Sequence, residues 1–428
     1  MSDPYQDALS RALSVGGSGD WYRLGSELYA RGMWGSAAGC FARCVAADSE
    51  DHRGWTNLGW CLHLVGRHKE ARDVLDRAIV LAPGEARPRA LMGQVLLTLG
   101  GVSWALRSAK LGAELGPGEA VNRVGYALAL FAAGEWERGW LEYEHRFAYK
   151  IPEFLTRPYR LWRGETVGHL YVEAEQGLGD ALMALRWVPL AAERAERVTL
   201  FVHGALYGLC ESAWVGRPGN VTVLPLPRPL PEADAWCPMM SLPAALGLGG
   251  PEKIAPYIRG VREDVVSFGG VPFSPVKRVG ICWAGNPTHE QARHRDCPLE
   301  NWLRLAELPG VELHSLQVGD AAGEMSQNGA FGLVLDRGPE ITNFLDTAKV
   351  VAGLDLVITV DTAVAHLAGA MRVPCWMLVN QRGRDFRWGV AGETTGWYPS
   401  MRLVRRGFEE DWGSVMRRVE GMLRELVR

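Results

Sequence analysis

The chain has 428 residues, with 46 lysines and arginines against 49 aspartates and glutamates, which gives a formal net charge of −3. This length allows about three domains, and the near-neutral charge argues against a general nucleic-acid-binding surface. Because no run of about 18 uncharged apolar residues occurs, we expect no membrane span. The eight cysteines form no Cys-x-x-Cys pair and the N-terminus lacks an apolar signal core, so we expect reduced thiols and a cytoplasmic location.

The first third of the chain repeats every 34 residues. Small and large residues recur together at this spacing, at Leu24-Gly25, Leu58-Gly59 and Met92-Gly93, and single glycines recur at Gly32, Gly66, Gly100 and Gly134. The pattern resembles tetratricopeptide repeats, in which two antiparallel helices cross closely at small residues. We therefore predict a helical solenoid over 1–150, with three clear repeats in 18–119 and a degenerate repeat in 120–149.

Two interpretations of this solenoid remain open. It either only supports the rest of the chain, or its concave groove holds a protein or peptide. We favour the groove, because solenoid surfaces usually recognise a partner. The fourth unit ends in "GEWERGWLEYEHRF" (134–147), whose aromatic residues have helical spacing. We interpret them as an apolar seam toward the next domain.

From about residue 166 the period changes to alternating strands and helices. This alternation predicts parallel sheets. A Gly- and Pro-rich stretch at 269–277 reads as a linker between two such series. The expected fold is therefore α + α/β, a solenoid followed by two facing Rossmann-like doubly wound domains, 151–270 and 271–428. The expected strands are 169–174, 197–202, 220–226, 278–285, 311–317, 355–360 and 374–379, and the expected helices include 241–249, 346–354 and 411–427.

The stretch "VITVDTAVAHLAGA" (357–370) places polar residues where an apolar strand becomes an apolar helix. Ligands of parallel sheets bind at the carboxyl ends of the strands, and a helix N-terminus offers free N–H donors to an anion. Asp361 and Thr362 stand at that point, and His366 follows one helical turn later. An aspartate there suits a helix N-cap or a ligand hydroxyl better than a diphosphate.

Several stretches of residues 165–410 resemble the tetratricopeptide-linked glycosyltransferases of bacteria. These have the glycosyltransferase B fold and are related to heptosyltransferases and more remotely to O-GlcNAc transferases. The matching stretches are "EQGLGDALMALRWVPL" (175–190), "CPMMSLP" (237–243), "WAGNPTHEQARHRDCPL" (283–299), "DLVITVDTAVAHLAGA" (355–370), and "DFRW" (385–388) with "WYPSMRLVRR" (397–406).

The resemblance implies inverting transfer of a sugar from a nucleotide sugar to an acceptor hydroxyl, with the nucleotide on the C-terminal domain. It implies a catalytic acid or base at Asp180, in a glycine loop. It implies no metal cofactor, and the chain has no Asp-x-Asp motif. The glycines of that loop are Gly177 and Gly179, and the implied donor-binding residues are Asn286, His289, Arg293, Arg295, Asp361, Thr362 and His366.

Each of these residues also has a purely structural interpretation. Asp180 could cap its helix, and His366 could be a packed histidine. Thr362 and Asn286 could only fix turns, and the basic residues of 289–295 could form a solvated loop. We favour donor contact for His366 and phosphate contact for the loop, and leave Asp180 open.

The chain departs from the family pattern at Gln291, Ala292 and Asp296, and Asp296 could pair with Arg295 and weaken phosphate binding. Two functions therefore stay open. The first is a glycosyltransferase whose repeat groove recruits a protein acceptor, with flagellin or another surface protein as the expected target. The second is a scaffold or sugar-nucleotide-binding protein that has lost turnover.

Overall fold

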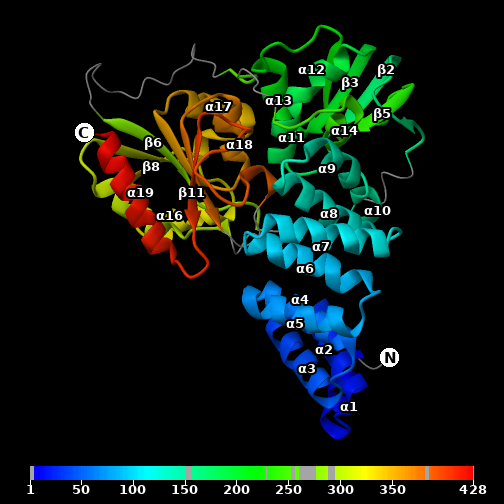
Figure 1. Ribbon diagram of the computed structural model, residues 1–428. Coiled ribbons are helices and arrows are strands. Elements are labelled where there is room, and N and C mark those ends of the chain that lie inside the picture. The colour runs from blue at the N-terminus through cyan, green and yellow to red at the C-terminus, as the bar shows by residue number, and fades with distance from the viewer. Residues whose placement is uncertain are drawn as a thin grey trace. The chain divides into compact units, whose positions relative to one another are not determined.

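The computed structural model of the protein describes residues 4–150, 157–227, 229–251, 256–259, 276–287, 295–380 and 385–427. The chain divides into two compact units, Met1–Thr156 and Arg157–Arg428 (Figure 1). The first unit is helical, and the second contains two parallel sheets.

Consecutive helices of the first unit pack against one another as hairpins, α2 with α3, α4 with α5, α6 with α7 and α8 with α9 (Figure 1). The helices are α1 (Pro4–Ser14), α2 (Ser18–Ala30), α3 (Trp34–Ala47), α4 (His52–Leu64), α5 (His68–Leu81), α6 (Ala86–Thr98), α7 (Val102–Leu115), α8 (Ala120–Ala132), α9 (Trp136–Tyr143) and α10 (Arg146–Lys150).

The recurring glycines explain why the hairpins form. A Cβ on Gly59 would lie 2.6 Å from Leu75, and a Cβ on Gly93 would lie 2.9 Å from Ala109, so each pair of helices crosses at a residue without a side chain. The four turn glycines of the 34-residue period all have left-handed φ, a conformation that glycine adopts without strain. They are Gly32 (φ 72°), Gly66 (91°), Gly100 (86°) and Gly134 (79°). The predicted tetratricopeptide solenoid is confirmed.

The aromatic residues of 134–147 pack inside the first unit. The rings of Trp136, Trp140 and Tyr143 lie 5.4, 4.6 and 5.9 Å from the ring of Phe131 on α8. Trp140 is 1% exposed. These residues therefore help to hold α9 on α8.

The first sheet of the second unit has the order β1-β5-β2-β3-β4, and all its strands are parallel. Its strands are β1 (Arg160–Leu161), β2 (Val167–Glu173), β3 (Ala195–His203), β4 (Val221–Leu226) and β5 (Ala235–Pro238). The α-helices in this part of the chain are α11 (Leu178–Ala184), α12 (Val188–Ala192), α13 (Gly204–Ser212) and α14 (Leu242–Leu246).

The second sheet has the order β11-β10-β9-β6-β7-β8 and is also entirely parallel. Its core includes the fully buried Trp302 and one face of α19. The strands are β6 (Lys277–Cys282), β7 (Val311–Ser315), β8 (Val334–Asp336), β9 (Leu356–Val360), β10 (Cys375–Asn380) and β11 (Met401–Arg406). The α-helices are α16 (Glu324–Gln327), α17 (Phe344–Ala352), α18 (Ala363–Ala370) and α19 (Trp412–Leu426).

Short 3-10 helices connect many of these elements. Among the described residues they are η2 (Leu185–Trp187), η3 (Met239–Ser241), η5 (Leu299–Asn301), η6 (Leu303–Glu307), η7 (Asp320–Gly323), η8 (Ala330–Gly332), η9 (Gly338–Glu340) and η10 (Phe386–Trp388).

The downstream α/β character is as predicted, but four strands were not anticipated. They are short or lie at sheet edges, where periodicity is weak: β1, β5, β8 and β11. The helix expected at 241–249 is shorter, because Gly247 adopts a left-handed conformation (φ 67°) directly after Leu246. The strand expected to reach residue 285 ends at Cys282. Of the expected linker, Lys277 begins β6 and residues 269–275 lie outside the described part of the chain.

Candidate functional site

The strand order of both sheets identifies the edge where a ligand is expected. In the first sheet the chain runs outward from β2 through β3 to β4 and then returns to β5 on the other side of β2. In the second sheet it runs outward from β6 through β7 to β8 and returns to β9 on the other side of β6. Such switch points, at the carboxyl ends of parallel strands, are where doubly wound sheets bind ligands. Gly177 and Asp180 follow β2, and Asp361 and Thr362 follow β9.

The two helices that begin at these switch points pack on one another. Helix α11 contacts α18, and a Cβ on Gly179 would lie 2.6 Å from Cδ2 of His366. Only glycine allows the two helices to approach this closely. The structure therefore brings together Gly179 and His366, which are far apart in the sequence.

Both carboxylate oxygens of Asp180 are engaged. Oδ2 accepts a hydrogen bond from the Gly177 backbone N–H at 3.0 Å, which caps α11, and Oδ1 accepts one from Nη2 of Arg387. The side chain of Asp180 is 21% exposed and that of Arg387 only 4%. Asp180 thus acts as a helix cap and as half of a mostly buried ion pair.

Arg387 is the central cation of this site and was not singled out from the sequence. Its Nη1 donates to Asp385 at 2.6 Å, and its Nε lies 3.0 Å from the sulfur of Met183. Burial, and then the negative charges of Asp361 and Asp180, raise the pKa of Asp385, while Arg387 acts in the opposite direction. The only hint in the sequence was an acid and an arginine close together in "DFRW".

His366 is buried. It is 4% exposed, its Nδ1 lies 2.9 Å from the hydroxyl of Tyr398, and its ring lies 5.3 Å from that of Trp388. Burial, and then the positive charges of Arg387, Arg186 and Arg295, hold its pKa well below the usual value. The ring of His366 is therefore enclosed by other side chains of the protein.

Arg186 is a second buried cation that the sequence did not reveal. Its Nη1 and Nη2 both donate to the Trp397 carbonyl at 3.1 Å, and its guanidinium lies 4.9 Å from the ring centre of Tyr398. Its Nε donates to the Met183 carbonyl at 3.1 Å. Arg186 therefore fixes the segment that carries Tyr398, and through it the ring of His366.

Arg295 lies beside the start of α18. Its Nη1 is 3.7 Å from Oδ2 of Asp361, and its Nε is buried without a hydrogen-bond partner in the described part of the chain. Asp296 instead accepts the Gly285 backbone N–H at 3.0 Å, and burial raises the pKa of its carboxyl group. Arg295 thus faces Asp361, while Asp296, which could have paired with it, binds the backbone of Gly285.

The remaining predicted residues divide into two groups. Thr362 is the N-cap residue of α18, and its hydroxyl lies 3.0 Å from that of Thr359, while Asn286 is exposed just beyond β6. His289 and Arg293 lie outside the described residues, as do the altered positions 291 and 292.

In the described part of the chain, three or more His, Cys, Asp or Glu side chains nowhere gather as metal ligands would. No helix in that part combines the length and the apolar character that a membrane span requires. All eight cysteines are free and buried.

Comparisons with known proteins support the repeat assignment. A family model described as "Tetratricopeptide repeat" matches residues 22–86. The chain is 25% identical over 417 residues to Protein FlbA of Caulobacter vibrioides, covering 87% of this chain and 67% of FlbA. The N-terminal unit is therefore a tetratricopeptide-repeat solenoid, and the protein as a whole is similar to FlbA.

Solved structures similar to this chain include those of MamA, YrrB and SycD. A crystal structure of MamA is 18% identical, with a TM-score of 0.30, and the match covers 35% of this chain and 87% of MamA. YrrB, described as a TPR protein with an unusual peptide-binding site, is 15% identical with a TM-score of 0.29, over 35% of this chain and 75% of YrrB. The Yersinia enterocolitica chaperone SycD, solved with a YopD peptide, is 25% identical with a TM-score of 0.22, over 22% of this chain and 72% of SycD.

Proposed function

We propose that the second unit binds a nucleotide sugar and transfers its sugar to a hydroxyl of a protein acceptor held by the repeat unit, as expected for a glycosyltransferase B fold. The observation that carries this proposal is the contact of α11 with α18 at the carboxyl ends of two parallel, doubly wound sheets. The positive charges of three arginines act on the buried ring of His366 at this contact, those of Arg387, Arg186 and Arg295.

The donor diphosphate would lie at the first turn of α18. The first N–H groups of a helix have no partner within the helix and attract anions. Arg295, whose Nε has no hydrogen-bond partner among the described residues, supplies a cation beside that turn. These groups offset part of the negative charge of a diphosphate, and we propose that transfer is independent of metal ions.

In an inverting transfer the acceptor oxygen bonds to the anomeric carbon as the bond from that carbon to the diphosphate breaks, and a base takes the hydroxyl proton. Asp180 is our first candidate for that base. It becomes available if a phosphate oxygen of the donor replaces its carboxylate on Arg387. Asp385, whose pKa is raised, is the alternative on the other side of the same guanidinium.

The acceptor would be a protein segment on the first helices of the repeats. Tyr22 and Tyr29 on α2 accept hydrogen bonds of 3.1 Å from Asn57 and Trp60 on α4, which gives this face a row of polar and aromatic side chains. Such a row suits a peptide, whose backbone needs hydrogen-bond partners and whose side chains stack on rings.

Incubation with a panel of sugar nucleotides tests the proposal. We expect one of them to bind in a calorimetric titration and to release its nucleoside diphosphate, detected by chromatography, faster than buffer alone. Absence of binding by every sugar nucleotide and nucleoside diphosphate would contradict the proposal.

A scaffold without turnover is the second candidate, because two observations favour it. Both oxygens of Asp180 are occupied, and Arg295 already faces Asp361. This candidate predicts nucleotide binding without release of diphosphate, even when the acceptor is present. The same two measurements therefore separate the candidates.

A further inference from the structure

The repeat unit has a groove that the proposed function does not use. It has a volume of about 540 Å³ and is lined by α5, α6 and α7. No lining residue belongs to α2 or α4, which carry the row of polar and aromatic side chains described above. The groove is therefore a separate surface of the solenoid.

The groove exists because the third repeat departs from the first two. At one position of the 34-residue period the repeats have Trp21, Trp55 and then Arg89, and at a second position they have Arg43, Arg77 and then Leu111. A tryptophan on the first helix and an arginine on the second are thus replaced by an arginine and a leucine. Arg89 and Leu111 both line the groove.

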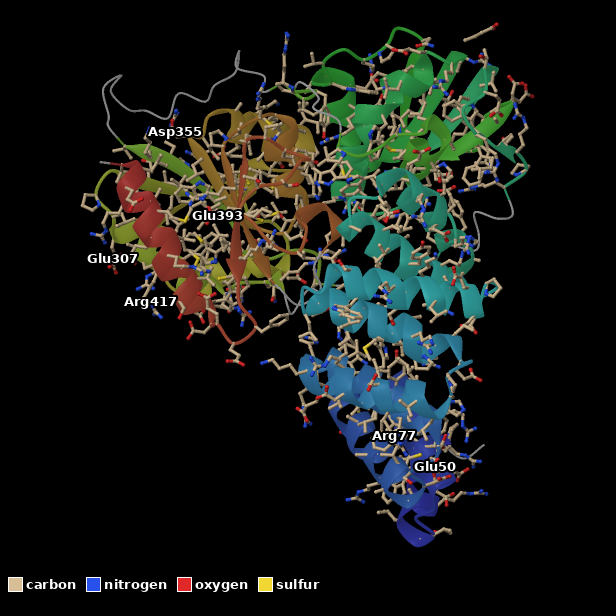
Figure 2. The ribbon with its side chains drawn as sticks, viewed as in Figure 1. Glu50, Arg77, Glu307, Asp355, Glu393 and Arg417 are labelled. Carbon is tan, nitrogen blue, oxygen red and sulfur yellow. The ribbon has the colours of Figure 1, made fainter. Side chains whose placement is uncertain are left out.

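In the first two repeats the tryptophan and the arginine have partners within the solenoid. The Arg43 guanidinium lies 4.6 Å from the ring centre of Trp21. Trp55 Nε1 donates to the Ser49 carbonyl at 2.9 Å. Arg77 pairs with Glu50 at 3.1 Å, and both residues are labelled in Figure 2. In the first two repeats, the tryptophan and arginine at these positions therefore already have partners within the solenoid.

In the third repeat the equivalent place is open. Trp104 is 65% exposed at the rim and Leu111 is 37% exposed, while Met92 on α6 contributes to the lining and is buried. An apolar depression with an exposed tryptophan, a methionine and arginines has the composition that protein interfaces favour.

Charge decides what the groove accepts. Arg107 lies 5.3 Å from the ring centre of Trp104, and Arg89 donates only to the Pro83 carbonyl, so neither forms an ion pair within the described residues. On the α5 wall Arg72 pairs with Asp73 at 2.7 Å, and Asp76 adds a negative charge. The uncompensated positive charge therefore lies on the α6 and α7 side, opposite Asp76.

We propose that this groove binds a short peptide segment of a partner protein that carries an apolar anchor and acidic residues. The anchor lies against Trp104 and Leu111, and the carboxylates lie against Arg89 and Arg107. Asp76 orients the segment, because it repels an acidic residue placed against α5. Charge-assisted hydrogen bonds to arginine supply the specificity.

The test uses the full chain and a phage-displayed library of random dodecapeptides. We expect the selected peptides to share an aromatic or leucine anchor next to aspartate or glutamate. Fluorescence anisotropy of a labelled consensus peptide should show binding that weakens at least tenfold in Trp104→Ala and in the charge reversal Arg89→Glu/Arg107→Glu. Replacing the peptide acids by lysine should restore binding to the charge reversal.

Matched variants control for folding and net charge. Val80→Ala removes another exposed apolar side chain, and Lys69→Glu/Lys110→Glu makes the same charge change outside the groove lining. Both should bind the peptide as the parent chain does. Three outcomes would overturn the proposal: no peptide is selected, the selected peptides lack acids, or they bind all variants equally. So would self-association of the parent chain, measured by sedimentation, that Trp104→Ala abolishes, since the groove would then hold a second copy.

Discussion

At the scale of single residues, the site is a balance of buried charges. Arg387 lies between Asp180 and Asp385, and Arg295 faces Asp361. Removing one partner of a buried pair leaves the other charge uncompensated, which costs more than the pair contributes. Each of these side chains therefore has a structural role, and a functional test must separate the two roles.

Asp180→Asn is the first such test. The amide still caps α11 but leaves Arg387 short of one negative partner, so we expect the second unit to lose about 1–3 kcal/mol of stability. If Asp180 is the base, turnover falls by about 10²–10⁴-fold while nucleotide affinity is kept. Calorimetric melting and steady-state rates measure the two effects.

Asp346→Asn is the matched control, because Asp346 also accepts a backbone N–H (Thr342, 3.2 Å) at the first turn of a helix. It should leave turnover unchanged. Near-normal turnover in Asp180→Asn would make Asp180 structural and direct the search to Asp385 or Glu175. Glu175 is held by the Met240 backbone N–H at 3.2 Å.

Arg295→Ala tests the proposed diphosphate site. A charge-assisted hydrogen bond to phosphate contributes about 1.5–3 kcal/mol, so we expect nucleotide affinity to fall about tenfold or more. Isothermal titration calorimetry measures it. The control is Arg278→Ala. Arg278 lies at the start of β6, and its Nε is likewise 3.7 Å from an aspartate, Asp355. Equal affinities in the two variants would remove Arg295 from the site.

At the scale of elements, the contact between α11 and α18 determines the site. Gly179 allows it, and a Cβ there would lie 2.6 Å from the ring of His366, closer than real Cβ contacts. The ring cannot simply move away, because Trp388 and Tyr398 surround it. The helices must separate to accept any side chain at this position.

Gly179→Ala should therefore destabilise the second unit by about 1–3 kcal/mol, the usual cost of overpacking, and should weaken nucleotide binding at the same time. Thermal melting and titration measure the two effects. Gly19→Ala is the control, since nothing lies within 4 Å of a Cβ there. Unchanged melting of Gly179→Ala would mean that α11 and α18 do not need close contact.

The hairpin of α4 and α5 contains a pH-sensitive contact. The ring of His63 stacks on Trp60 (5.0 Å), and its Nδ1 lies 3.1 Å from Nδ1 of His68, so one of the two rings must be an acceptor and unprotonated. Burial, and then His68, lower the pKa of His63 to about 3. The unfolded chain has a histidine pKa of about 6.5 and binds the proton more readily.

Protons are therefore taken up when the repeat unit unfolds between pH values of about 6.5 and 3, and its stability falls as the pH falls through this window. We expect the melting temperature of the repeat unit to drop between pH 7.5 and pH 5 by more in the parent chain than in His63→Gln. Equal drops in the two chains would show that this contact does not titrate.

At the scale of the whole molecule, the proposed function divides between the two units. Residues 1–156 and 157–428 are each compact, and all residues of the candidate site belong to the second unit. The repeat unit holds the surfaces suited to protein partners. The proposed donor binding and the proposed acceptor choice can therefore be tested separately.

A chain that begins at Arg157 should bind the nucleotide with the affinity of the full protein but should no longer glycosylate its protein acceptor. Titration and an acceptor-modification assay measure the two properties. Modification of the intact acceptor at the normal rate by this shortened chain would show that the repeats do not select the acceptor.

Local periodicity was enough to predict much of this architecture. The 34-residue spacing of glycines determines the repeat hairpins, because each glycine is required by a crossing or turn within a few dozen residues of it. Alternating strands and helices predicted the α/β unit. The position of Asp361 and Thr362 directly after an apolar strand predicted that they lie at the carboxyl end of the sheet. The sequence did not predict short edge strands such as β1 and β8, because two or three residues are too few to show a periodic pattern.

Only the tertiary structure decided how the charges combine. Arg387 and Asp180 are 207 positions apart, and Arg186 and Trp397 are 211 positions apart, so no local pattern links them. The same holds for His366, whose ring is enclosed by Gly179, Trp388 and Tyr398 from three segments. A buried charge or ring is defined by the groups that replace water around it, and packing of distant segments supplies those groups.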